Sequence, residues 1–496
     1  MRPLLIFLFL LNTVVAQSAF VINEFMAVND ASSSDGQGEF DDWVEIYNPE
    51  DAPQDLGGLY LSNDREDPTL WRVPENTMVA PLGRLLIWLD NDPEQGPLHA
   101  PFRLRGSGGV VILTDRDGVI LLDEIEFPAQ HPDIAFGRAT PESETAIFLL
   151  KPTPGAPNDP TGVSTLGGVN YSRPAGVFNE PFETTLSTET EGGSIRYTTD
   201  GREPSIFNST NYTGPFTISE SMCLRADVTV GGQVVSPLAT QIYLAVDDEV
   251  SNFDSDLPVA LIDSRGHDFS QDTSLGMGFP QSSVYSAFFD TEENGRAAIT
   301  ATPQHVGRAG MNVRGASSRG WPKKQFKFET WGEGDEDRDI PLLGLPADSD
   351  WILAAPYFDK SLMRNEITFR WWEKLGYYSP RTRFIELFVD MNGDERFTMD
   401  DYQGVYVLTE KIKASADRLE INDDSYILEA TNVNQHWTSA TGIRLKYVEP
   451  RDSEEDPERK QAGREHYSAV EQAVLNDDFQ DPNEGYLQYL DLPSRV

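Results

Sequence analysis

The chain has 496 residues, more than one hydrophobic core usually serves, which predicts about three domains. Its 39 Lys and Arg against 81 Asp and Glu give a net charge of −42, spread along the whole sequence. Because binding to a phosphate backbone requires clustered cations, this charge argues against nucleic acid as a partner and favours solubility and cation binding. A single cysteine, Cys223, excludes an intrachain disulfide, and with only six His it also excludes a Cys-rich zinc site.

The N-terminus has the features of an export signal. Arg2 precedes an apolar run over residues 4–11, and small residues lead to a cleavage site after Ala16. We therefore predict that residues 1–16 are a signal peptide and that the protein is secreted or held at the cell surface. The apolar run is shorter than the ~20 residues of a membrane span, and no longer one follows, so we predict no membrane span.

Residues 17–158 show the pattern of an all-β domain. Short apolar or alternating runs, such as 43–47, 85–89 and 110–113, are separated by Gly, Pro, Asp and Asn. Residues 115–118 have the composition of a hairpin tip between two such runs.

Four segments of this domain resemble a lamin-tail domain: VINEF at 21–25, DWVEIYN at 42–48, LGGLYLS at 56–62 and PGAPN at 154–158. The resemblance implies an immunoglobulin-like β-sandwich of the kind that, in bacteria, sits on exported proteins and binds or spaces them. A cell-surface or extracellular-matrix component is the kind of partner it implies. None of these residues forms a catalytic set, so we interpret them as core and turn residues.

A second β domain is expected over residues 169–246. Residues 159–168 before it are rich in Pro, Gly and Thr and are predicted to be a linker. The acidic residues 247–256 after it are predicted to be a solvated linker.

Three segments of the second domain resemble the C-terminal sandwich domain of chitobiases and β-hexosaminidases: IRYTTDGREP at 195–204, YTGPF at 212–216 and CLRA at 223–226. The resemblance implies a second immunoglobulin-like sandwich with an accessory role. Polysaccharide processing rests on this domain alone and ranks last, because a catalytic barrel with paired carboxylates has no room in the chain.

The last region, residues 257–496, mixes strands, at 383–389 and 402–409, with a helix over 361–375. Within it lies the one basic window of the chain, residues 307–328, which contains six cations and no acidic residue: Arg308, Arg314, Arg319, Lys323, Lys324 and Lys327. Glycines interleave with these cations, as in a phosphate cradle. Phe326 and Phe328 alternate with polar residues, which predicts a half-buried strand, and a solvated basic strand is the alternative to a phosphate site.

Five segments of this region, in order, resemble the spore-coat CotH kinase family: RGASSR at 314–319, PKKQFKF at 322–328, LGLPADSDW at 343–351, DKSLMRN at 359–365 and QGVYVLTEKI at 403–412. The resemblance implies an α+β kinase-like domain. It also implies an enzyme that uses ATP and a divalent metal to phosphorylate Ser or other hydroxyl groups of secreted or surface proteins.

By resemblance, Lys324 is the first choice for the lysine that contacts the phosphates, with Arg314 beside it and Lys327 as the alternative. A strand lysine needs a partner to hold its position, and Glu410, directly after a predicted strand, is the candidate. Three residues at the start of the predicted helix either position the nucleotide or cap that helix and pair internally: Asp359, Arg364 and Asn365.

The catalytic acids of the family have no matching positions here. In the family they lie in the second half of the domain, beyond a helical stretch of the kind seen at residues 486–496, where this sequence ends. We therefore expect a truncated kinase-like domain, either a fragment of a longer product or a degenerate kinase. An end within a helix favours the fragment.

A twelve-residue segment from Asp390 has the ligand spacing of an EF-hand calcium loop and also resembles a dockerin-type loop. The residues at positions 1, 3, 5, 7, 9 and 12 are Asp390, Asn392, Asp394, Arg396, Thr398 and Asp401. Glu395 replaces the usual Gly at position 6 and Asp replaces Glu at position 12, which predicts weak affinity. An acidic hairpin tip between two strands is the alternative.

Two functions follow from these patterns. The first is an exported CotH-like kinase whose two β domains bind or space it at the cell surface. The second is a non-catalytic surface or adhesion protein in which the kinase-like half is a scaffold.

Overall fold

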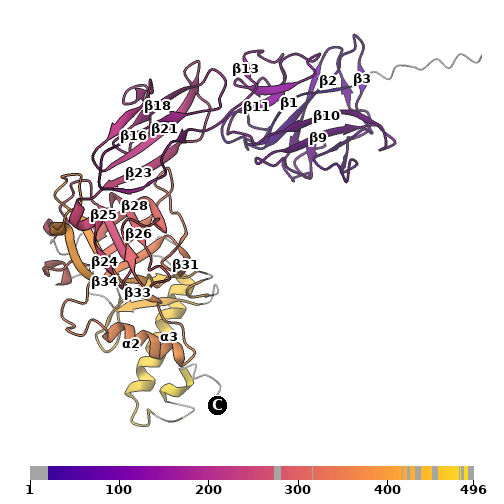
Figure 1. The fold of residues 1–496 in the computed structure, drawn as a ribbon. Coiled ribbons are helices and arrows are strands. Elements are labelled where there is room, and N and C mark those ends of the chain that lie inside the picture. Colours follow the sequence, from indigo (N-terminus) through magenta and orange to yellow (C-terminus); the bar gives the residue numbers. More distant parts are fainter. Residues whose placement is uncertain are drawn as a thin grey trace, which may run out of the picture.

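The computed structural model describes residues 20–272, 281–315, 317–415, 417–421, 425–430, 437–449, 456–479, 481 and 485–489. The predicted signal peptide, residues 1–16, lies outside the described residues, as does most of the predicted C-terminal helical stretch. Among the described residues, 39% lie in strands and 11% in helices, which confirms the expectation of several β domains. Figure 1 shows three β modules in chain order, with the helices α2 and α3 beside the far end of the third. The kinase-like α+β architecture of residues 257–496 stays a prediction.

The first module packs two sheets face to face. The larger has the order β13-β12-β11-β1-β2-β7-β8 and the smaller β10-β9-β4-β5. The strands of the larger sheet are β1 (Val21–Met26), β2 (Asp42–Tyr47), β7 (Arg84–Leu89), β8 (His99–Ala100), β11 (Ala135–Arg138), β12 (Ala146–Leu149) and β13 (Gly162–Val163). Those of the smaller are β4 (Tyr60–Ser62), β5 (Trp71–Arg72), β9 (Gly109–Thr114) and β10 (Leu121–Phe127), and β3 (Gln54–Asp55) pairs with β6 (Met78–Val79).

The core of this module lies between its two sheets. Phe25 of β1 meets Phe127 of β10 with ring centroids 4.9 Å apart, and both side chains are buried. Burying each such ring stabilises the fold by roughly 1.5–3 kcal/mol. The strands expected at 43–47, 85–89 and 110–113 are β2, β7 and β9, and the predicted hairpin tip joins β9 to β10, with Gly118 at φ +71°.

The lamin-tail-like segments meet in a buried polar cluster. Glu24 of β1 stands opposite Glu45 of β2, and neither is exposed. Asn23 Nδ2 donates to Glu45 Oε1 at 2.6 Å and to Asn158 Oδ1 at 2.7 Å. The Thr153 hydroxyl donates to Glu24 Oε2 at 2.8 Å. The cluster therefore fastens the closing segment, residues 151–158, onto strands that lie far from it in sequence.

The second module has one main sheet, ordered β15-β23-β21-β18-β19, to which β22 adds beside β21. Its strands are β15 (Gly176–Phe178), β18 (Ser194–Thr198), β19 (Thr210–Asn211), β21 (Met222–Val230), β22 (Gln233–Val234) and β23 (Ala239–Ala245). Two further pairs lie apart from that sheet: β14 (Asn170–Tyr171) with β17 (Leu186–Ser187), and β16 (Phe182–Thr184) with β20 (Phe216–Ile218).

The predicted linkers carry more structure than their composition indicates. Within residues 159–168, β13 joins the first sheet because Val163 is buried there, and the Thr165 hydroxyl donates to the carbonyl of Glu189. Within residues 247–256 lie α1 (Asp248–Ser251) and β24 (Asp254–Ser255), since Val250 is fully buried and Asp247 caps α1. Both segments connect modules, but each contains regular secondary structure and at least one buried side chain.

The third module is a closed barrel of seven strands ordered β25-β26-β28-β29-β32-β34-β33. Its strands are β25 (Val259–Asp263), β26 (Ser282–Phe289), β28 (His305–Val313), β29 (Phe326–Thr330), β32 (Asp350–Ala354), β33 (Thr382–Asp390) and β34 (Tyr402–Glu410). The predicted strands at 383–389 and 402–409 are β33 and β34. The predicted helix over 361–375 is α2 (Arg364–Lys374).

Smaller elements surround the barrel. A three-stranded sheet, β35 (Ile427–Ala430), β37 (Arg444–Glu449) and β36 (Trp437–Thr438), precedes α3 (Pro457–Leu475). The others are β27 (Ala297–Ala298), paired with β24; β30 (Ile340–Leu342), paired with β31 (Leu345–Asp348); and the 3₁₀ turns η1 (Phe269–Gln271), η2 (Ser317–Gly320), η3 (Met399–Asp401) and η4 (Tyr486–Tyr489). Among the described residues, none of the helices has the length and apolar character needed to cross a membrane.

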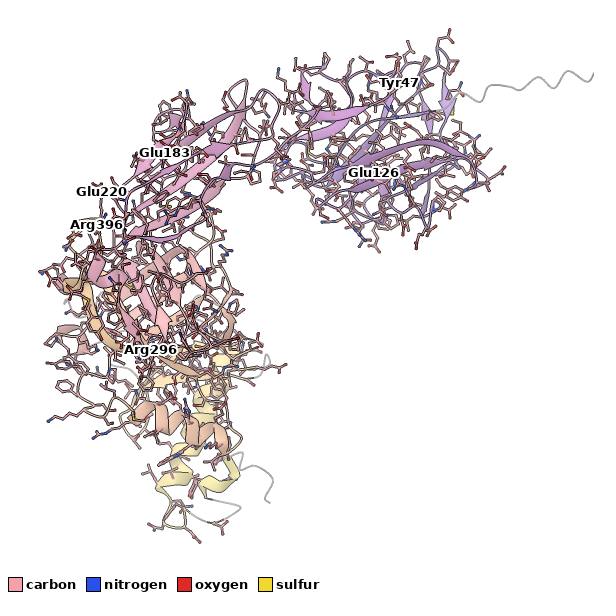
Figure 2. The ribbon with its side chains drawn as sticks, in the orientation of Figure 1. Tyr47, Glu126, Glu183, Glu220, Arg296 and Arg396 are labelled. Carbon is pink, nitrogen blue, oxygen red and sulfur yellow. The ribbon has the colours of Figure 1, made fainter. Side chains whose placement is uncertain are left out.

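The hairpin between β33 and β34 joins the barrel to the second module. Arg396 lies at this junction (Figure 2), where its guanidinium donates to the carbonyls of Val246 at 2.6 Å and Ser219 at 3.0 Å. The backbone N–H of Ser221 donates to the carbonyl of Glu395 at 2.8 Å. The second and third modules therefore share a hydrogen-bonded interface.

The buried Glu24 predicts a pH-dependent stability for the first module. Burial raises the pKa of Glu24 to about 7, against hydrogen bonds from Thr153 that lower it. The folded state thus holds this proton more tightly than the unfolded chain, so the stability that protonation provides is lost as pH rises from about 5 to 8. We expect a loss on the order of 2–3 kcal/mol, seen by calorimetry as a lower transition temperature. Glu24→Gln should reduce this slope, leaving the part due to Asp42, whose pKa burial also raises to about 7, and the exposed control Glu144→Gln should keep the full slope. A Glu24→Gln variant with the wild-type slope would contradict the assignment.

Candidate functional site

The alternation of side chains in β29 decides which lysine faces out of the barrel. Phe326 and Phe328 are each 1% exposed and point into the barrel core, so Lys327 between them points outward and is exposed. In the sheet, Lys327 lies opposite Asn312 of β28 and Ile352 of β32. The half-buried strand predicted from the Phe326 and Phe328 spacing is confirmed.

Other cations gather around Lys327 on the outside of the barrel. The protein atoms around the outward side chain partly desolvate Lys327 and lower its pKa; the charges of Lys411, Lys446 and Arg314 lower it further, while Asp350 opposes them. Cations can shift one another's pKa in this way only when they lie close together. We call this group the basic face, and its members are Arg314, Lys327, Lys411 and Lys446.

The four cations come from different elements. Arg314 directly follows β28, and burial lowers its pKa while Glu429 of β35 raises it. Lys446 of β37 pairs with Glu429, Nζ to Oε2, at 3.0 Å. The basic face therefore lies where the barrel wall meets the three-stranded sheet.

An ion-pair network lies at the edge of the basic face. Lys411 Nζ is 2.6 Å from Asp350 Oδ1, and Lys413 Nζ is 2.8 Å from both Asp348 Oδ1 and Asp350 Oδ2. Although burial raises the pKa of Asp350, its hydrogen bonds to these two lysines leave it below its usual value. The network joins two of the CotH-like segments, and our sequence reasoning missed it. The paired spacings, Asp348 with Asp350 and Lys411 with Lys413, were the available signal.

The lysine predicted first, Lys324, is not part of the basic face. It is only 9% exposed, and its Nζ donates to the carbonyl of Arg319 at 2.5 Å. The hydroxyl of Tyr406 donates to the carbonyl of Lys324 at 2.8 Å. The ammonium group is thus held by its own loop.

The predicted pair between Lys324 and Glu410 is wrong. Glu410 is buried and pairs with Arg381, Oε1 to Nη2, at 2.8 Å. The carbonyl of Lys324 meets the hydroxyl of Tyr406 on β34, and at about 3.3 Å per residue Glu410 lies roughly 13 Å beyond Tyr406 along that strand. Each of the two charged groups has another partner, the Arg319 carbonyl for Lys324 and Arg381 for Glu410.

Asp359 and Arg364 act at the start of α2. Asp359 Oδ1 accepts hydrogen bonds from the backbone N–H and the hydroxyl of Ser361, and Oδ2 accepts from the N–H of Arg364 at 2.9 Å. These bonds, led by that from the Ser361 hydroxyl, lower the pKa of Asp359. Arg364 Nε is 3.4 Å from Asp359 Oδ1, and Asn365 is exposed on the same turn. This arrangement matches the capping alternative.

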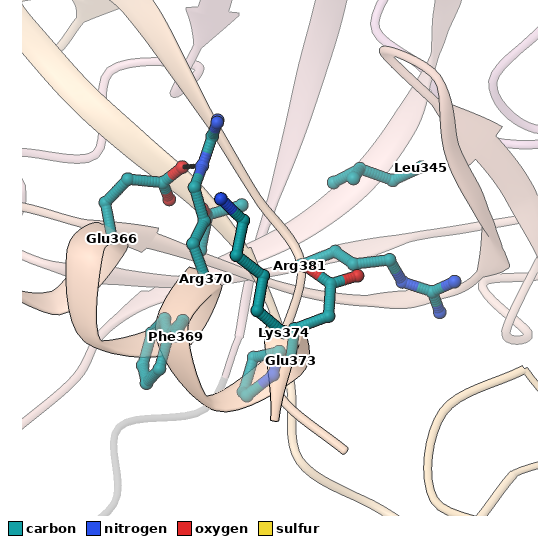
Figure 3. A pocket seen from close by; sticks show the side chains of 9 residues that line it. Leu345, Glu366, Phe369, Arg370, Glu373, Lys374 and Arg381 are labelled. Atoms are coloured by element: carbon teal, nitrogen blue, oxygen red, sulfur yellow. Dashed lines mark hydrogen bonds and ion pairs between the residues drawn. The ribbon is translucent and has the colours of Figure 1, made fainter. Parts of the chain in front are cut away.

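A pocket of about 310 Å³ opens between α2 and the residues that lead into β33 (Figure 3). Glu366 and Arg370, which both line this pocket, form an ion pair. Arg381 also lines it, and its guanidinium pairs with Glu410. The lining residues are Leu345, Glu366, Phe369, Arg370, Glu373, Lys374, Pro380, Arg381 and Thr382. None of the four cations of the basic face is among them.

The predicted calcium loop forms the hairpin between β33 and β34. Asp390 is 1% exposed; its Oδ1 accepts from the N–H groups of Asn392 and Gly393, and its buried Oδ2 has no hydrogen-bond partner among the described residues. Asn392 and Asp394 bond to each other at 3.0 Å. Glu395, at the position where Gly is usual, has φ +62°.

The far end of this loop is closed by a capping box. Asp401 Oδ2 accepts from the N–H of Thr398 at 2.8 Å. Burial raises the pKa of Asp401 to about 6, and the charges of Asp390 and Asp394 add to this rise. The Arg396 side chain turns away to the second module. The acidic ends of the loop thus lie close enough to repel each other.

Three family models match the chain, each over one segment. Residues 14–128 match the Lamin Tail Domain, and residues 173–240 match the Chitobiase/beta-hexosaminidase C-terminal domain. No curated protein matches the sequence. Residues 311–496, which include every member of the basic face, match CotH kinase protein, so the three predicted resemblances and their order are confirmed.

Proposed function

We propose that the chain is an exported CotH-like protein whose barrel binds ATP at the basic face. The CotH resemblance gives phosphoryl transfer to hydroxyl groups of secreted or surface proteins as the reaction class, although the family's catalytic acids have no matching positions in residues 257–496. The two N-terminal β modules bind or space the protein at the cell surface. The observation that carries this proposal is the convergence of Arg314, Lys327, Lys411 and Lys446 in a chain of net charge −42.

A triphosphate fits this group of charges. Four cations held together repel one another, and a bound polyanion relieves that repulsion. Lys327 stands on a strand fixed by hydrogen bonds on both sides, so it is a pre-positioned contact for a phosphate oxygen. Arg314 adds a planar guanidinium that can hold two phosphate oxygens at once.

The carboxylates around the basic face are already paired with lysines, so these residues suit the nucleotide phosphates better than the divalent cation that accompanies them. Asp350 is held by Lys411 and Lys413, and Glu429 is held by Lys446. ATP supplies the transferable phosphoryl group, and a divalent cation would neutralise its charge. We assign no protein ligand to that cation. Asp350 instead holds Lys411 in place beside the phosphates.

Replacing Lys327 should weaken nucleotide binding. We expect Lys327→Met to raise the dissociation constant for Mg·ATP at least about tenfold, because one charge-assisted hydrogen bond to phosphate is worth ~1.5–3 kcal/mol. Isothermal titration calorimetry measures this, with the exposed Lys360→Met as the control that should bind as the wild type does. Wild-type affinity in Lys327→Met would contradict the site. A wild-type chain that binds no ATP at millimolar concentration would favour the alternative, a non-catalytic surface or adhesion scaffold.

A second proposed function is weak Ca²⁺ binding by residues 390–401. The observation that favours it is the buried, unpartnered Oδ2 of Asp390 at the first ligand position. Within the described part of the chain, no three carboxylates of this loop have oxygens within 4.8 Å of one another, so a cation would draw them together. Arg396 would transmit this tightening to the second module.

Millimolar Ca²⁺ should therefore raise the melting temperature of the joined second and third modules. We expect Asp390→Asn to abolish the rise contributed by this loop and the exposed Asp400→Asn to retain it, measured by calorimetry with and without EDTA. If these modules melt at the same temperature in EDTA and in about 10 mM Ca²⁺, the loop does not bind Ca²⁺ and the proposal is wrong.

A further inference from the structure

The loop between β1 and β2 in the first module gathers three carboxylates. Asp35, Glu39 and Asp41 each place one carboxylate oxygen within 4.8 Å of the other two. In a chain with 81 acidic residues exposed acidic groups are common, so their gathering alone decides nothing. The hydrogen bonding of Asp35 is what sets this group apart.

Asp35 is only 8% exposed, and one of its two carboxylate oxygens accepts hydrogen bonds from the backbone of its own loop. Its Oδ1 accepts hydrogen bonds from the backbone N–H groups of Gln37 and Glu39, each at 2.8 Å. Its Oδ2 is buried and has no hydrogen-bond partner in the part of the chain that the structure describes. Desolvating a carboxylate oxygen that has no donor costs free energy, so a ligand that supplies positive charge would stabilise Asp35 here.

The other two carboxylates have few partners for their charge. Arg103 Nη2 is 3.1 Å from Asp41 Oδ1, and Gln95 Nε2 donates to Glu39 Oε2 at 2.7 Å. Three carboxylates with one guanidinium leave two negative charges, which is the charge that a divalent cation balances. Gln95 also has a buried Oε1 with no partner among the described residues, so a fourth oxygen lies close by.

The loop holds its shape without a ligand. Asn29 Oδ1 accepts from the backbone N–H groups of Ser32 and Ser33, each at 3.2 Å. Its Nδ2 donates to the carbonyls of Ser33 at 2.6 Å and Asp41 at 2.8 Å. Asn29 thereby ties the start of the loop to its end and brings Asp41 back towards Asp35.

We propose that Asp35, Glu39 and Asp41 bind a Ca²⁺ ion in the first module. All the ligand atoms are oxygens, which hard cations such as Ca²⁺ prefer. The nearby His99 already pairs with Asp90, which argues against a zinc site. An irregular loop suits the flexible coordination of Ca²⁺ better than the strict octahedron of Mg²⁺. The site is independent of the proposed nucleotide site and of the loop at residues 390–401.

The test titrates Ca²⁺ into the full chain carrying Asp390→Asn, which removes the contribution of the other loop. Calorimetry should detect one bound Ca²⁺ with a dissociation constant on the order of 10⁻⁴ to 10⁻³ M. Adding Asp35→Asn should raise that constant at least about tenfold, while adding Glu94→Gln, an exposed acid in the same module, should leave it unchanged.

The outcomes decide the proposal either way. Circular dichroism and melting in EDTA establish that each variant is folded, and Asp41→Asn replaces Asp35→Asn if the latter does not fold. Unchanged Ca²⁺ affinity in a folded Asp35→Asn or Asp41→Asn variant overturns the site. Binding of Mg²⁺ more tightly than Ca²⁺ overturns the choice of cation.

Discussion

In a closed barrel each strand has one side towards the core and one towards the outside, and this alternation determines the candidate site. Phe326 and Phe328 fill the core, so Lys327 must face outward. Arg314 and Lys411 directly follow β28 and β34. Val313 and Leu408 of these strands point into the core, so continuing the alternation places both cations on the outer side. A one-residue slip in β29 would bury the lysine and expose two aromatic rings, so the register of this strand is strongly fixed.

The barrel and the second module pack as one unit. A single cluster of buried residues contains Cys223 and Leu244 of the second module together with Val259 and Phe289 of the barrel. Gly201 has φ +76°, and a Cβ there would lie 2.1 Å from the hydroxyl of Tyr285, so only glycine fits this close approach. The hairpin that carries Arg396 therefore packs at an interface with a shared hydrophobic core. A conformational change in that hairpin would alter its hydrogen bonds to the second module.

Local patterns predicted much of the fold and less of the site. Apolar alternation located β2, β7 and β33, and it gave the correct strand for Lys327. It could not choose between Lys324 and Lys327, because Lys324 lies in the segment before β29, where no alternation applies and its Nζ bonds to the carbonyl of Arg319. The pairing of Glu410 with Arg381 depends on the long-range register of β33 with β34. The cluster around Asp35 could not be predicted either, since acidic residues are abundant throughout the chain and only the fold shows which carboxylate is buried without a donor.

Hydrogen–deuterium exchange with and without a non-hydrolysable ATP analogue tests the central claim most directly. If the outward side of β29 is the nucleotide site, the ligand should slow exchange in β29 and β37 and in the residues that directly follow β28 and β34, which together bear the basic face. The lamin-tail-like module should not respond. Protection confined to α2 and residues 380–382 would place the nucleotide in the pocket beside Arg381 and contradict the account.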